Sequence, residues 1–69
     1  MKQYTLKFEE FKKYTVVRPY KTLVMPNGQK KYRIFFDNKN RNYWATSTEK
    51  ALKICYNDLI SYNIIKEVA

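Results

Sequence analysis

Histidine is absent from this 69-residue chain, and glycine and cysteine each occur once. The lack of histidine excludes the usual zinc sites and histidine-based acid–base catalysis. Gly28 alone cannot build a glycine-rich phosphate loop, and Cys55 alone cannot close an internal disulfide. No apolar run approaches the roughly 20 residues of a membrane span, and no signal-peptide pattern is visible. We therefore expect no cofactor, no metal, no membrane contact, and a reducing, cytoplasmic location.

The remaining candidates for catalysis have simpler explanations. Glu9 and Glu10 form the one adjacent acid pair, but neighbouring side chains do not face each other on a helix or a strand. Cys55 lies within an apolar stripe of helical spacing and has no histidine to act as its base. We interpret the acids as a solvated surface and Cys55 as a buried structural residue, and we expect that the protein is not an enzyme.

Positive charge is concentrated in one part of the chain. We expect residues 1–69 to form a single small domain, and its seven tyrosines, four phenylalanines and one tryptophan can build a core. Nine of the 14 Lys and Arg residues lie in residues 12–41, where Asp37 is the only acid, so this segment carries the whole net charge of +8. Such a block is typical of a surface that binds polyanions. The alternative is a solvated basic surface that keeps the protein in solution.

The segment 4–14 fits two patterns. Alternating apolar residues up to Phe8 suit a strand, whereas the apolar spacing of the whole segment also suits a helix capped by Thr5. Acidic residues precede basic ones, as a helix dipole favours. We expect a short helix near residues 6–13.

A β-hairpin is predicted next. The β-branched residues 15–17 begin a strand, and Pro19 requires this strand to be an edge or to end there. An extended pattern resumes over 20–25, and Pro26-Asn27-Gly28 has the residue types of a tight turn. The turn joins residues 20–25 to a strand at 29–36.

The second of these strands has two chemically different faces, because successive side chains alternate. One face is apolar and is assigned to the core: Tyr32, Ile34 and Phe36. The other is basic with one aromatic ring: Lys31, Arg33 and Phe35.

A polar loop at 37–42 and a third strand at 42–46 are expected to follow. We assign Trp44 to the core under a helix, with base stacking as the alternative role, and place Tyr43 and Ala45 on the other face of this strand.

A helix should begin near Thr48. Thr46 and Glu49 have the spacing of a capping box, with Ser47 as an alternative cap, and Asn63 suits a left-handed C-terminal cap. An apolar stripe runs along this helix: Ala51, Leu52, Cys55, Tyr56, Leu59 and Ile60. The expected fold is α+β, with a three-stranded, or at most four-stranded, antiparallel sheet covered on one face by the C-terminal helix.

The candidate binding residues are the basic and aromatic side chains of the predicted hairpins. Arginine offers a planar fork to phosphates or guanine edges, lysine a mobile charge, and aromatic rings can stack on bases. Phe35 and Tyr43 could instead simply cover the sheet. The candidates are Arg18, Lys21, Lys30, Lys31, Arg33, Phe35, Lys39, Arg41 and Tyr43.

Part of the sequence resembles two families of DNA-binding domain. The matching text is Arg41-Asn42-Tyr43-Trp44-Ala45-Thr46-Ser47-Thr48, followed by a helix over 49–57. It is similar to the DNA-binding domain of plant ethylene-response factors and to the amino-terminal arm-binding domains of phage and transposon integrases. The resemblance covers roughly 14–62 and implies outward-facing Arg41 and Tyr43, with Arg33 on the neighbouring strand. Ala45-Thr46 stand where those domains have a glycine before the helix, and this chain has an extra N-terminal segment.

We expect from these features a non-catalytic nucleic-acid-binding module, with duplex DNA as the first choice of partner and RNA as the second. Its size and composition suit an accessory protein of a phage or mobile element. The alternative is a small phage-encoded inhibitor, such as an anti-CRISPR protein, that binds a host protein or nucleoprotein complex through the same basic face.

Overall fold

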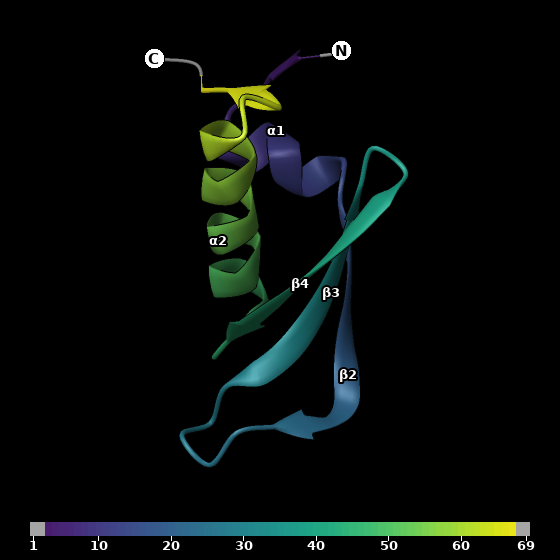
Figure 1. Cartoon of the computed structure of the whole chain (residues 1–69), viewed down its shortest axis with the longest axis vertical. Coiled ribbons are helices and arrows are strands. Elements are labelled where there is room, and N and C mark those ends of the chain that lie inside the picture. The colour runs from purple at the N-terminus through teal and green to yellow at the C-terminus, as the bar shows by residue number, and fades with distance from the viewer. Residues whose placement is uncertain (1–2, 68–69) are drawn as a thin grey trace.

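A three-stranded antiparallel sheet carries the C-terminal helix on one face (Figure 1). The computed structural model describes residues 3–67, apart from the side chains of residues 21–24. The elements in chain order are β1 (Tyr4–Thr5), α1 (Phe8–Lys13), β2 (Val16–Val24), β3 (Lys30–Phe36), β4 (Lys39–Ala45), α2 (Thr48–Ser61) and β5 (Ile65–Lys66). The α+β class and the three-stranded sheet, in the order β2-β3-β4, are confirmed. The two shortest strands, β1 and β5, form a separate parallel pair.

The short N-terminal helix is also confirmed, with a different cap. Glu9 and Glu10 lie in the first turn of α1, where the helix dipole favours negative charge. Lys7 is the N-cap in place of the expected Thr5, and its backbone N–H donates to Glu10 Oε1 at 3.3 Å. Thr5 belongs instead to β1, so the segment contains both a strand and a helix.

The β2–β3 hairpin forms as its turn residues predict. The Gly28 N–H donates to the Met25 carbonyl at 2.9 Å, and Gly28 has a φ of 88°, which a residue without a Cβ adopts easily. β2 continues through Pro19 as an edge strand, where the missing N–H is tolerated. The pairing with β3 shifts register between Pro19 and Val24.

The β3–β4 turn is tighter than expected. Only Asp37 and Asn38 connect the strands, since Phe36 pairs directly with Lys39. Their φ values of 53° and 61° are those of a two-residue hairpin turn with both central residues left-handed. The predicted loop over 37–42 is therefore wrong. Asp and Asn tolerate left-handed backbone, and the polar residues after them form an edge strand.

Both ends of α2 have well-defined caps. Ser47, the alternative cap, accepts a hydrogen bond from the Lys50 N–H at 3.2 Å. At the other end, Asn63 has a φ of 61° and the Ile64 N–H donates to the Leu59 carbonyl at 2.9 Å. This Schellman-type ending confirms the left-handed role of Asn63 and turns the chain back toward β5.

The core lies between the sheet and the two helices, and aromatic rings form its centre. Phe11 of α1 lies 5.2 Å from the Phe36 ring of β3 and 5.2 Å from the Tyr56 ring of α2, between ring centroids. The Tyr56 hydroxyl donates to the Leu6 carbonyl at 2.6 Å, so its polar end is satisfied. Cys55 is buried, as its place in the apolar stripe predicts.

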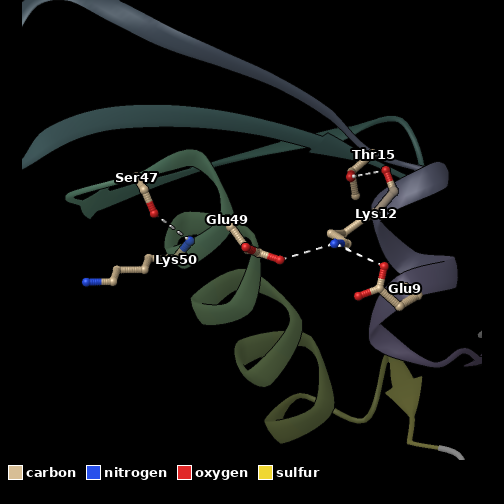
Figure 2. A network of polar contacts seen from close by, with 6 residues as sticks. All are labelled: Glu9, Lys12, Thr15, Ser47, Glu49 and Lys50. Carbon is tan, nitrogen blue, oxygen red and sulfur yellow. Dashed lines mark hydrogen bonds and ion pairs between the residues drawn. The ribbon is translucent and has the colours of Figure 1, made fainter.

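Lys12 links the two helices on this side of the sheet (Figure 2). Its Nζ lies 3.0 Å from Glu9 Oε2 and 3.2 Å from Glu49 Oε1, and these contacts raise the pKa of the Lys12 amine. Thr15 Oγ1 donates to the Lys12 carbonyl at 3.1 Å, at the point where α1 leads into β2. Lys12, although part of the basic segment, is thus paired with acids in the helical layer.

Candidate nucleic-acid interface

The face of the sheet that points away from the helices gathers basic and aromatic side chains. Directly paired residues in an antiparallel sheet project to the same side. Lys31 therefore shares a face with Trp44, its partner on β4, and Arg33 shares that face with its partners on both edge strands, Arg18 and Asn42. The outer face, as we call it below, consists of Val16, Arg18, Tyr20, Lys31, Arg33, Phe35, Asn40, Asn42 and Trp44. Figure 1 shows the β2–β3 hairpin reaching well beyond the helices.

Tyr20 organises the middle of the outer face. Its hydroxyl accepts hydrogen bonds from Arg33 Nε, at 2.9 Å, and from Arg33 Nη2. The same hydroxyl donates to Asn42 Oδ1 at 3.1 Å, so one side chain of β2 reaches across β3 to β4. Arg33 Cζ and Lys31 Nζ lie 5.0 Å and 5.4 Å from the Tyr20 ring centroid, close enough for cation–π attraction. These contacts hold two cations over one ring.

Aromatic and aliphatic surface lies on both sides of this cluster. Trp44 is 38% exposed, although a large aromatic ring is favoured in the core of so small a domain. At the other end, half-buried Phe35 and exposed Val16 border a hollow of about 550 Å³ that also touches Asn40.

The outer face carries positive charge without a matching acid. Arg18 is exposed and Lys31 and Arg33 are half-buried, and no Asp or Glu belongs to the outer face as defined above. Among described acids, Glu9 and Glu49 pair with Lys12 in the helical layer (Figure 2), and Asp37 in the β3–β4 turn accepts from the Tyr4 hydroxyl at 2.8 Å. The positive charge of this face is thus open to an external anion.

The structure brings together four of the nine predicted binding residues. They are the outer-face members Arg18, Lys31, Arg33 and Phe35. Lys30 and Lys39 are exposed at strand ends, but their partners Ala45 and Phe36 place them on the helix-facing side. The Lys21 side chain lies outside the described residues.

Arg41 and Tyr43 were predicted to share the binding face, and this prediction is wrong. They pair with Ile34 and Tyr32, which face the helices. Arg41 Cζ lies 5.3 Å from the Tyr62 ring centroid at the end of α2. Tyr43 packs against the core, where burial and the neighbouring Cys55 thiol raise the pKa of its hydroxyl.

Trp44 was predicted to lie under the helix, and that prediction is wrong for the same reason. A six-residue loop leaves the parity of the third strand open, whereas a two-residue turn after Phe36 sets Trp44 opposite Lys31. The Asp37-Asn38 pair was the sequence signal that could have fixed this register. Tyr20 and Asn42 were also missed, because their roles depend on contacts across three strands.

The outer face offers guanidinium and ammonium groups and aromatic rings for contact with a ligand. Arginine and lysine can contact phosphates, and exposed rings can stack on bases. Within residues 3–67, no group of three or more His, Cys, Asp or Glu side chains is arranged to hold a metal ion. Across the same part of the chain, no helix combines the length and apolar character needed to cross a membrane.

Comparison of the chain with protein-family models, with curated proteins and with solved structures finds no match in any of the three.

Proposed function

We propose that this protein binds nucleic acid, without catalysis, through the outer face of its sheet. The observation that carries the proposal is the joint presence of Arg18, Lys31 and Arg33 with exposed Trp44 on a sheet face that neither helix covers. Phosphates supply most of the affinity in such complexes, and aromatic rings add stacking on bases. A surface kept basic only for solubility does not require aromatic rings among its cations.

Tyr20 strengthens the proposal because it fixes the position of a cation. The Arg33 guanidinium donates twice to the Tyr20 hydroxyl and lies over the same ring. An arginine ordered before binding loses less side-chain entropy when it meets a phosphate. Three of its five N–H donors remain for a ligand, since two are used by Tyr20.

The test compares charge changes on the two sides of the molecule. Lys31→Ala and Arg33→Ala should each weaken binding to a labelled oligonucleotide, while the domain stays folded by circular dichroism. The matched controls are Lys50→Ala and Lys66→Ala, which remove the same charge from exposed positions in α2 and β5. Equal losses in both pairs would show only general attraction between a cationic protein and a polyanion, and would contradict a site on the outer face.

A second measurement separates nucleic acid from a protein partner. The tagged protein should capture nucleic acid from a cell lysate, and treatment with nuclease should abolish this capture. If no oligonucleotide binds at low salt and a protein is retained after nuclease, the proposal fails. The inhibitor hypothesis would then explain the same basic face.

A further inference from the structure

We infer that the outer face is built for single-stranded nucleic acid rather than for a duplex. This inference rests on the proposed function and specifies its ligand. Two properties of the outer face support it: the way its cations lie, and the spacing of its aromatic rings.

The central cations lie along the sheet instead of projecting from it. Reading base edges in a groove about 8.5 Å deep requires side chains that reach outward. Arg33 is instead bonded to the Tyr20 hydroxyl, and both Arg33 and Lys31 lie over the Tyr20 ring. Cations that lie along the sheet suit a single nucleic-acid strand that crosses it, because the phosphates and unpaired bases of that strand can contact the sheet directly.

Exposed Trp44 and half-buried Phe35 stand at opposite ends of the cation cluster. Trp44 pairs with Lys31, four residues along β3 from Phe35, which corresponds to about 14 Å at roughly 3.4 Å per residue. The row containing Arg18 and Arg33 lies midway between these two rows. Stacked neighbouring bases are only about 3.4 Å apart, so Trp44 and Phe35 would hold bases of a splayed strand, with the phosphates between them near the arginines. The hollow beside Phe35, of about 550 Å³, is also lined by Asp37 and offers space for one of these bases.

The experiment uses the full chain and Trp44 as an intrinsic probe, since it is the only tryptophan. Four ligands of equal length are compared: a 12-nucleotide DNA strand, the RNA of the same sequence, the corresponding DNA duplex, and a 12-nucleotide strand of abasic sites. We expect at least one natural single strand to bind more tightly than the duplex and the abasic strand, and to quench the Trp44 fluorescence. The comparison of DNA with RNA identifies the preferred sugar.

Ring variants test the stacking step separately from charge. Trp44→Ala should weaken single-strand binding about 5- to 150-fold, the usual effect of removing a ring that stacks on a base. Trp44→Tyr should restore much of the affinity, because it retains a ring. The matched control is Tyr62→Ala, which removes a 56% exposed ring at the far end of α2.

The failures of the two proposals are distinguishable. Duplex binding as tight as single-strand binding, or equal affinity for the abasic strand, overturns the inference and leaves nucleic-acid binding intact. Absence of binding to all four ligands overturns the proposed function itself.

Discussion

Trp44 differs from the aromatic residues of the core because it lies on the outer face, where its ring is not covered. Phe11 and Tyr56 are almost fully buried, whereas Trp44 is 38% exposed on the outer face. We expect Trp44→Ala to lower the free energy of unfolding by about 1–2 kcal/mol, within the ordinary range of point substitutions. Phe11→Ala should cost about 3–5 kcal/mol, the usual loss for a core aromatic residue. Urea denaturation measures both.

The fluorescence of the free protein provides an independent check on the position of Trp44. Acrylamide should quench the emission readily, since the ring contacts solvent. Strong shielding from the quencher, or a loss for Trp44→Ala as large as that for Phe11→Ala, would return Trp44 to the core and remove it from the proposed interface.

Tyr43 and Cys55 should make the free energy of unfolding fall at alkaline pH. Burial raises the pKa of both groups in the folded chain, with the Cys55 thiol contributing at Tyr43. In the unfolded chain they lose protons near their ordinary values, about 8.5 for Cys and 10 for Tyr. Deprotonation therefore favours the unfolded state as pH rises. The contribution of these two groups to stability should be constant up to about pH 8 and decline above pH 8.5.

In Tyr43→Phe, the decline of stability with pH should be shallower above about pH 10, where free tyrosine ionises. Native Cys55 should react slowly with thiol reagents at pH 8 and rapidly in denaturant, because the thiolate is the reactive form. A flat stability profile to pH 11, together with fast native labelling, would contradict the burial of this pair.

At the level of elements, the two-residue turn between β3 and β4 determines which side chains form the outer face. Asn38 has a φ of 61°, which glycine adopts with less strain than any residue with a Cβ. Asn38→Gly should therefore be neutral or stabilise the protein by up to about 1 kcal/mol, as type I′ turns favour glycine there. Asn38→Val should destabilise it by about 1–2 kcal/mol. The urea midpoint of Asn38→Gly should equal or exceed that of the parent protein. The urea midpoint of Asn38→Val should lie below it.

Local signals in the sequence predicted most of the elements. The Pro26-Asn27-Gly28 turn, the apolar stripe through Cys55 and the left-handed Asn63 each depend on a few neighbouring residues, and each is confirmed. The β3–β4 register depends on one turn length. A loop of even one residue more or less would move every side chain of β4 to the other face. For this reason the outer-face residues Lys31, Arg33 and Phe35 of β3 were predicted correctly, whereas the side chains of β4 were assigned to the wrong faces.

At the scale of the whole molecule, the outer face carries cations without acids, whereas the helical layer carries charges of both signs. The acidic residues Glu9 and Glu49 neutralise Lys12 in the helical layer, and the outer face keeps Arg18, Lys31 and Arg33 without an acid among its members. The charge of residues 12–41 alone indicated a polyanion surface. It could not show that Arg41 turns toward α2, or that Tyr20 joins three strands, because both are tertiary contacts.

The three cations of the outer face lead to a quantitative prediction for the salt dependence of binding. If Arg18, Lys31 and Arg33 each neutralise one phosphate, the logarithm of affinity should fall with the logarithm of salt concentration with a slope of about −2, at roughly 0.7 per phosphate of a single strand. Arg33→Ala should reduce the steepness by about 0.7. Trp44→Ala should lower affinity at every salt concentration and leave the slope unchanged, since stacking releases no counterions.

Lys50→Ala, which removes an exposed charge from α2, is the control and should change neither affinity nor slope. Fluorescence anisotropy of a labelled oligonucleotide, titrated between 50 and 200 mM salt, roughly the range over which such slopes are resolved, measures all four proteins, including the one without tryptophan. A slope much steeper than that of three phosphates, and unaltered by Arg33→Ala, would mean that the whole cationic surface attracts the ligand. The outer face would then have no special role, because binding confined to three cations must lose about a third of its salt dependence when one of them is removed.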